Sequence, residues 1–198
     1  QVGGSRSALG MDSEQAPVAE IAMVCELEDK LEDAAMKRKP IWLALLCSWW
    51  QAAGCLRQAH IIRRSFPVEA WSDYVQFFCR KGKQMHNRNG FYWGVPAETS
   101  SGYNWWGAFV KLYEERRGSN KGEEMMGSIF RADDLEFFKP SAVNAITQDA
   151  VKDVVKNPGI LATYSWRRFM PTLALKMKLT SAERLSLGDW MDATAVAK

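Results

Sequence analysis

The chain has 198 residues, of which 47% are hydrophobic and 12% aromatic. This composition excludes a disordered polypeptide and predicts one folded domain with a substantial core. The formal net charge of +3 is mild and does not by itself identify a nucleic-acid-binding protein.

The charges are unevenly distributed along the chain. Residues 12–33 hold eight acidic side chains against Lys30, whereas residues 57–88 hold seven basic side chains against Glu69 and Asp73. The basic excess fits a polyanionic partner. A solvated basic surface is the simpler explanation, and charge alone favours it.

Cysteine and histidine are too few and too scattered to predict a metal site. The four cysteines form no CxxC pair, and there are only two histidines (Cys25, Cys47, Cys55, Cys79, His60 and His86). We therefore expect reduced thiols in an intracellular protein and no zinc. Residues 41–56 are apolar but too short to cross a bilayer. There is no signal peptide, and the start at Gln1 rather than Met suggests a fragment.

The first third of the chain is predicted to be helical. Residues 1–15 are rich in Gly and Ser and predict a loose tail, so the domain occupies residues 16–198. A helical apolar stripe predicts a first helix from residue 17 to 35. Residues 41–53 are apolar nearly all round and predict a central core helix. A short third helix is expected at 56–62.

The middle of the chain contains the only strand signals. Residues 74–79 and 91–95 are aromatic and β-branched, and the basic segment 80–90 between them ends in Asn-Gly. This pattern predicts a β-hairpin. A helix is expected at 105–117 and an exposed loop at 118–127.

The last third is predicted to be helical again. Residues 141–157 show an amphipathic pattern, and residues 166–177 should form a helix kinked by Pro171. Residues 180–183, Thr-Ser-Ala-Glu, form a capping box that starts a short helix. The expected fold is mainly α with one small β-hairpin.

Three short motifs, with a basic segment between the first and the second, then follow one another along the chain. Residues 53–60 are AGCLRQAH and contain Arg57, and Lys81 lies 24 positions later in RKGK. Residues 164–168 are YSWRR and contain Tyr164 and Arg167. Residues 187–190 are LGDW, and Trp190 lies 23 positions after Arg167.

In order and spacing, these motifs resemble those of the catalytic domain of tyrosine recombinases, the phage-integrase family of mobile elements. The first motif resembles the family's small-Gly-x-Arg box, and Lys81 lies where the family has its hairpin lysine. The second motif resembles His-x-Leu-Arg-Arg, and the third resembles Leu-Gly-His or Gly-Gly-Trp. The resemblance covers residues 17–198 and does not include the DNA-clamping N-terminal domain of such enzymes.

The resemblance implies a function in DNA recombination and integration. Such enzymes cleave and rejoin DNA strands through a 3′-phosphotyrosine, without metal or small-molecule cofactor. Arg57 and Arg167 would neutralise charge on the phosphate, Lys81 would protonate the leaving oxygen, and Tyr164 and Trp190 would donate hydrogen bonds. The implied partner is double-stranded DNA, bound as a homo-oligomer and not at a membrane. The implied location is intracellular, and nuclear if the source is a eukaryote.

Three positions depart from the family pattern. Tyr164 replaces a histidine, and a phenol is a poor proton shuttle near neutral pH. His60 stands where an acid is usual, and we expect it to be a structural histidine. Asp189 would oppose anion binding if it pointed inward, or could pair with an arginine.

The nucleophilic tyrosine of the family lies in a short helix beyond the third motif. From Trp190 that helix reaches just past Lys198, and no tyrosine follows Tyr164. We therefore expect this polypeptide to lack the nucleophile, through truncation or loss. Two alternatives stay open, namely a degenerate relative that binds DNA without cutting it and a helical protein-interaction domain.

The aromatic residues are expected to be mainly structural. Tryptophans are more often core residues than stacking platforms, and this applies to Trp49, Trp50, Trp105, Trp106 and Trp166. For Trp190 two interpretations stay open, namely a core residue and a hydrogen-bond donor to phosphate. Nothing in the sequence places Tyr103 near the arginines.

Overall fold

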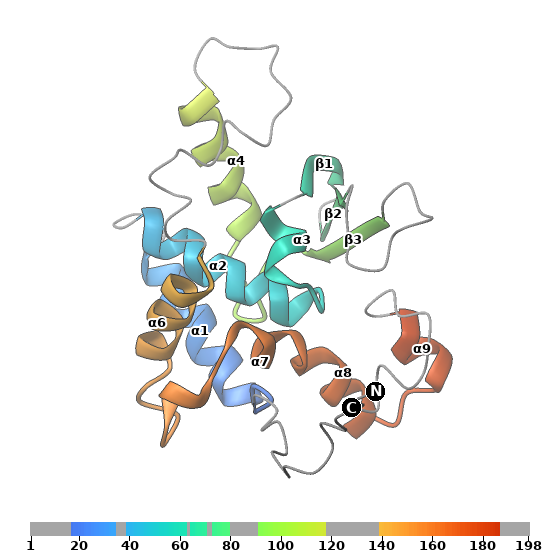
Figure 1. Cartoon of the computed structure of the whole chain (residues 1–198). Coiled ribbons are helices and arrows are strands. Elements are labelled where there is room, and N and C mark those ends of the chain that lie inside the picture. Colours follow the sequence, from blue (N-terminus) through green and yellow to red (C-terminus); the bar gives the residue numbers. More distant parts are fainter. Residues whose placement is uncertain are drawn as a thin grey trace, which may run out of the picture.

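The computed structural model describes residues 17–34, 39–62, 64–70, 73–79, 91–117 and 139–186. These residues form a mainly helical fold with one small antiparallel sheet (Figure 1). The predicted fold class, mainly α with a small sheet, is therefore confirmed at this level. Among the described residues, no helix is both long and apolar enough to cross a lipid bilayer.

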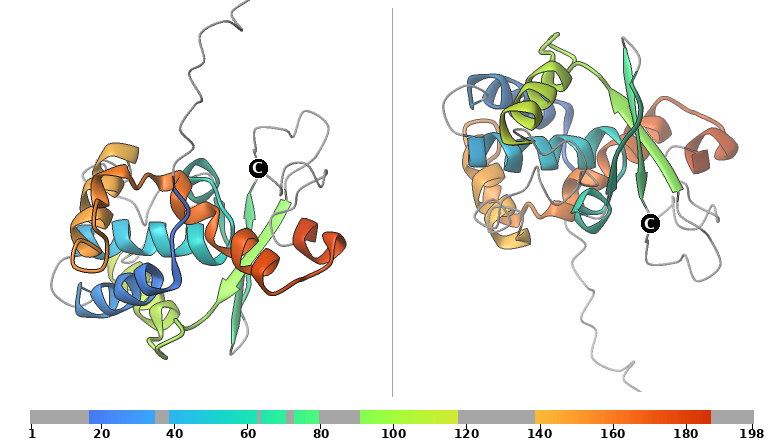
Figure 2. Two further views of the ribbon diagram at one scale, coloured as in Figure 1. Left: turned by 90° about the horizontal axis from the view of Figure 1, so that it is seen from below. Right: turned by 90° about the horizontal axis from the view of Figure 1, so that it is seen from above.

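Helix α2 (Lys39–Ala53) is the centre of the structure. It packs against α1 (Ile21–Ala34), α6 (Pro140–Ala150) and α7 (Thr163–Arg167). Helix α6 and the sheet lie on opposite sides of α2 (Figure 2). The central position follows from the sequence, because a helix that is apolar all round must be covered on every side.

Every residue of α2 from Trp42 to Ala52 is buried. Each large apolar side chain so buried stabilises the fold by roughly 1.5–3 kcal/mol. Ser48, a buried polar residue of this stretch, has an internal partner. The single hydroxyl proton of Thr147 is donated to the carbonyl of Val143. The Ser48 hydroxyl must therefore be the donor in its 2.9 Å bond to Thr147 Oγ1, and this bond joins α2 to α6.

Helix α1 is fixed to α2 by a buried carboxylate. Glu28 is only 4% exposed, and its Oε1 accepts a hydrogen bond of 2.8 Å from the indole nitrogen of Trp49. The backbone N–H of Ser100 donates to the same carboxylate at 3.1–3.2 Å, and the Ser100 hydroxyl donates to it as well. A buried charge is tolerated only with such partners. Glu28 therefore joins α1 and α2 to the loop that contains Ser100.

The sheet contains three strands in the order β1 (Arg64–Ala70), β2 (Tyr74–Cys79) and β3 (Phe91–Pro96). Strands β2 and β3 confirm the predicted hairpin, with Val75 opposite Val95 and Phe77 opposite Trp93. Strand β1 was not predicted. It contains a proline and an irregularity in its pairing with β2, features typical of an edge strand.

One face of the sheet packs on the aromatic core. Phe77 and Trp93 stack at 4.4 Å, and the ring of Trp50 lies 5.8 and 6.1 Å from them. Helix α4 (Trp105–Arg117) starts at the predicted residue and adds Trp105, whose ring is 5.4 Å from Trp50. The prediction of core tryptophans is confirmed for Trp49, Trp50, Trp105 and Trp166, which are buried, and Trp106 packs against the core while partly buried.

The helices of the last third are shorter than predicted. The expected helix 141–157 is α6, which ends at Ala150. The expected helix 166–177 is instead two helices, α7 and α8 (Phe169–Lys176), separated at Arg168. Pro171 explains the break, because its ring would clash with the carbonyl of the residue four positions earlier. In the first turn of α8, by contrast, proline is tolerated, because the N–H groups of a first turn have no intrahelical acceptor.

Three short helices complete the described fold. They are α3 (Gln58–Ile62), the 3₁₀ turn η1 (Pro158–Ile160) and α9 (Ser181–Ser186). The predicted capping box of α9 is confirmed, since Glu183 accepts from the Thr180 N–H at 2.7 Å and the Thr180 hydroxyl accepts from the Glu183 N–H at 3.3 Å. The predicted tail 1–15 and loop 118–127 lie outside the described residues.

Candidate functional site

The site is built on a sharp turn that follows α2. Gly54 closes the helix through a hydrogen bond of 2.9 Å from its N–H to the Trp50 carbonyl. Cys55 then takes the left-handed backbone conformation, with φ of 54°. This conformation is unfavourable for a residue with a side chain. The turn reverses the chain and brings Arg57 to the start of α3.

Arg57 is held by backbone bonds at the first turn of α3. Its carbonyl accepts the N–H of His60 at 2.8 Å, and its own N–H donates to Nδ1 of His60 at 3.4 Å. His60 thus has the local structural contact expected of it. Both bonds use the backbone of Arg57, and its side chain, which is half-buried, takes no part in them.

Arg167 approaches the same turn from α7. Its Nε donates to the carbonyl of Cys55 at 3.0 Å, and the residue is only 7% exposed. Ser165 fixes the start of α7, since its hydroxyl accepts the N–H of Ala162 at 3.1 Å and its carbonyl accepts the N–H of Ala19, just before α1, at 3.2 Å. The left-handed turn at Cys55 therefore fixes one edge of the Arg167 guanidinium.

The two arginines are close enough to affect each other. Burial, and then the nearby charge of Arg57, lower the pKa of Arg167, while Tyr164 and Cys55 act in the opposite direction. Burial also raises the pKa of the Cys55 thiol to about 12, although Arg167 opposes that rise. The thiol is thus protonated near neutral pH and is no nucleophile.

Tyr164 completes the group of residues that the structure brings together. Its side chain is 51% exposed, and the guanidinium carbon of Arg167 lies 5.9 Å from the centroid of its ring, within range of a cation–π contact. Arg57, Tyr164 and Arg167 therefore gather at the turn after α2. The other predicted site residues, Lys81 and Trp190, lie outside the described residues, as does Asp189.

The role of the Cys55 carbonyl was not predicted from the sequence. Gly54 signalled a turn after the helix, but glycine is the residue expected in the left-handed conformation. The structure places that conformation one residue later, at Cys55. A non-glycine residue in this conformation leaves no signal in the sequence.

Tyr103 lies at the other end of α2. Its hydroxyl accepts a hydrogen bond of 3.1 Å from the indole nitrogen of Trp42. Burial raises its pKa, and the bond from Trp42 opposes the rise. Trp42 belongs to the first turns of α2, whereas the arginines follow its last turn, so Tyr103 is not part of the site.

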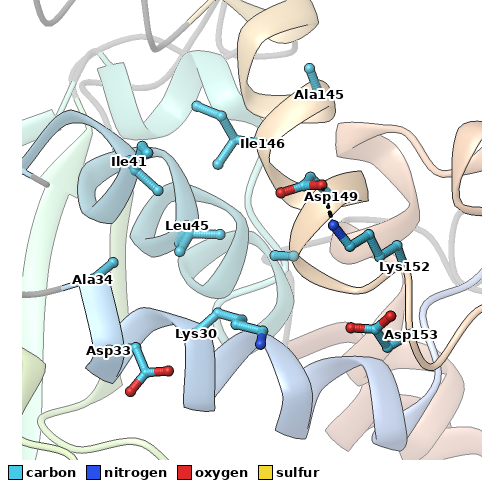
Figure 3. Close-up of a pocket in the computed structure, with 11 residues that line it drawn as sticks. Lys30, Asp33, Ala34, Ile41, Leu45, Ala145, Ile146, Asp149, Lys152 and Asp153 are labelled. Atoms are coloured by element: carbon cyan, nitrogen blue, oxygen red, sulfur yellow. Dashed lines mark hydrogen bonds and ion pairs between the residues drawn. The ribbon is translucent and has the colours of Figure 1, made fainter.

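A separate groove lies between α1, α2 and α6 (Figure 3). It has a volume of about 710 Å³ and an apolar floor that includes Ile41, Leu45 and Ile146. Its rim carries charges of both signs, with Lys152 paired to Asp149 at 2.9 Å. Because Ile41 and Leu45 belong to the first half of α2, this groove is distinct from the arginine site.

Within the described ranges, no three side chains of the metal-binding types come together. No family model matches the chain, and a search of the curated proteins also finds no match. The chemistry of the site is therefore argued from its residues alone. Two guanidiniums and an exposed phenol are donors suited to an oxyanion.

Proposed function

We propose that this chain is a DNA-binding domain of the tyrosine-recombinase type, in which Arg57 and Arg167 bind one phosphate of duplex DNA. The observation that carries the proposal is the bond from Arg167 to the carbonyl of Cys55, two residues before Arg57, with the exposed Tyr164 ring beside the same guanidinium. Two guanidiniums repel each other, and a bound phosphate would turn that repulsion into attraction.

The proposed chemistry assigns a separate role to each residue. Arg167, held by the Cys55 carbonyl, offers a preoriented fork, and Arg57 supplies a second cation from α3. Preoriented donors of this kind stabilise the charge that develops on a phosphodiester under attack. The Tyr164 hydroxyl donates a further hydrogen bond in the place of the family's histidine. Lys81 as general acid and Trp190 as donor belong to the proposal through the sequence motifs alone.

Duplex binding tests this proposal. We expect weak binding with a steep salt dependence and little sequence preference, because most contacts are to phosphates. Arg57→Gln should weaken binding at low salt about tenfold, equivalent to about 1.4 kcal/mol, and reduce the salt slope by about 1. Fluorescence anisotropy with a labelled duplex, repeated across a salt series, measures both quantities.

The matched control is Lys176→Gln, which removes one exposed positive charge from the last turn of α8. Arg57 is the residue of choice because Arg167 is buried, so its removal would also disturb the fold. Equal affinities for Arg57→Gln, Lys176→Gln and the unmodified chain would contradict the proposal and favour the protein-interaction alternative.

A DNA-binding relative without catalysis is the second candidate, and Tyr164 favours it. A phenol in the histidine position can still donate a hydrogen bond to phosphate, but a phenol is a poor proton carrier near neutral pH. Phosphate binding tolerates that exchange better than general acid–base catalysis does. The two candidates differ in cleavage and agree in binding.

A further inference from the structure

The second face of the sheet carries an exposed aromatic cluster that the arginine site does not use. Side chains alternate between faces along a strand, so Phe77 and Trp93 point to the core while their neighbours Phe78 and Tyr92 point away from it. Phe78 and Tyr92 are cross-strand partners, and their rings lie 5.0 Å apart. We call Tyr74, Phe78 and Tyr92 the outer aromatic face.

Two of the three rings of this face are exposed to solvent, and Phe78 is partly buried. Tyr92 is 56% exposed and Tyr74 is 37% exposed, although large aromatic side chains are ordinarily well buried. The side chain of Tyr74 lies against Gly94 on the neighbouring strand β3. A Cβ atom at Gly94 would collide with the tyrosine ring. The glycine lets one ring lie close to the backbone of β3. The sheet lies on the side of α2 away from α6 (Figures 1 and 2).

The chemistry of this face favours a nucleobase as its occupant. Aromatic rings on an antiparallel sheet stack with unpaired bases, because every base has a flat π-face. The sequence that joins β2 to β3 contains Arg80, Lys81, Lys83 and Arg88 and no acidic residue, and a segment of this charge suits a polyanion.

We propose that the outer aromatic face binds unpaired nucleobases by stacking, with Tyr92 and Phe78 as the platform. The inference rests on the proposed DNA-binding function and adds a second subsite to it. The arginines take the phosphate, and the sheet takes bases that have left the duplex. A duplex keeps its bases stacked internally, so only an unpaired strand can use this surface.

Three oligonucleotide probes separate the two subsites. They are labelled single-stranded dT oligomers, oligomers of the same length with abasic sites throughout, and a duplex of the same length. The abasic oligomer keeps the phosphates and removes the bases. We expect the dT oligomer to bind about tenfold more tightly than the abasic oligomer, given the usual strength of base–aromatic stacking. Fluorescence anisotropy at one salt concentration measures all three.

Tyr92→Thr is the decisive variant, because threonine retains the strand preference and lacks the ring. It should weaken binding of the dT oligomer about tenfold and leave the duplex and abasic oligomers unchanged. Tyr92→Phe should bind all three probes as the unmodified chain does. The matched control is Ile160→Thr, which removes an apolar side chain of similar exposure, 53%, from η1.

Several outcomes would overturn the inference. Equal affinity for the dT and abasic oligomers would show that bases contribute nothing. A uniform loss of all three probes with Tyr92→Thr would show that the residue acts through the fold. Self-association of the chain that Tyr92→Thr abolishes, with unchanged dT binding, would assign the face to a protein contact. Failure of the proposed function is distinguishable, because it would leave duplex affinity insensitive to Arg57→Gln.

Discussion

At the scale of single residues, the site depends on one strained position. The carbonyl of Cys55 orients Arg167 only because Cys55 has a φ of 54°. A residue with a Cβ atom is disfavoured there by roughly 1–2 kcal/mol. The strained backbone at Cys55 thus lowers the stability of the fold while it places the Cys55 carbonyl next to the Arg167 guanidinium.

Substitution of Cys55 tests this strain. Cys55→Gly and Cys55→Ala both remove the buried thiol, but only glycine adopts the left-handed conformation without strain. The greater freedom of glycine in the unfolded chain offsets part of that gain. We expect the glycine variant to be more stable than the alanine variant by about 0.5–1 kcal/mol. Urea unfolding of the pair measures the difference, and an equally or more stable alanine variant would refute the strain.

At the scale of elements, the N-terminus of α9 has a pH-dependent cap. Hydrogen bonds from the Thr180 hydroxyl, and then from its backbone N–H, lower the pKa of Glu183 below its ordinary value of 4.5. A lowered folded-state pKa contributes stability that is present above the unfolded value and is lost as pH falls through the folded value. The cap therefore weakens only below pH 4.5.

The Thr180→Ala variant tests this cap. Loss of the hydroxyl removes the first cause of the shift, so the pKa of Glu183 should rise toward its ordinary value. Helix α9 should also lose an N-cap contribution of about 1 kcal/mol. NMR titration of the Glu183 carboxyl carbon in both chains gives the shift. Serine at position 180 is the matched control and should preserve the low pKa, whereas titration of Glu183 at its ordinary value in the unmodified chain would contradict the cap.

Elements also show what the sequence could and could not predict. The central helix and the β2–β3 hairpin were predictable because their apolar patterns match their burial. Strand β1 was not, because Pro67 and mixed polarity hide an edge strand that only pairing with β2 specifies. The break at Arg168 follows from Pro171, which in the sequence predicted a kink within one helix and not the boundary between two helices.

The candidate site was predictable only in part. The motifs placed Arg57, Tyr164 and Arg167 on a shared site, and the structure brings these three together. Nothing in the residue pattern indicated the Cys55 carbonyl, because backbone conformation at a non-glycine turn is set by packing. The outer aromatic face was predicted as strand residues without a function.

At the scale of the whole molecule, the proposed function predicts that this chain binds DNA and does not cleave it. The 198-residue sequence contains no tyrosine after Tyr164. The Tyr164 ring faces the guanidinium of Arg167 at 5.9 Å, which puts its phenol beside the proposed phosphate and not in line with the scissile bond. Cleavage with covalent capture requires such in-line positioning.

We therefore expect no covalent protein–DNA adduct from residues 1–198 on a nicked suicide substrate. Denaturing gel electrophoresis of a strand labelled at its 5′ end, on the side of the cut that would stay joined to the protein, would detect an adduct, and an active recombinase on its own suicide substrate provides the positive control. An adduct mapped by mass spectrometry to Tyr164 or Tyr103 would show that this placement of the active site is wrong.

The bond between Arg167 and the Cys55 carbonyl spans 112 positions. Closing a loop of that length costs about 4 kcal/mol of chain entropy, whereas one hydrogen bond contributes about 1 kcal/mol. The contact therefore cannot form ahead of the packing of α7 on α2. During synthesis from the N-terminus, the ribosome must release α7 before the two arginines can meet. A growing chain has Arg57 early, yet the proposed phosphate site is complete only after α7 has packed on α2.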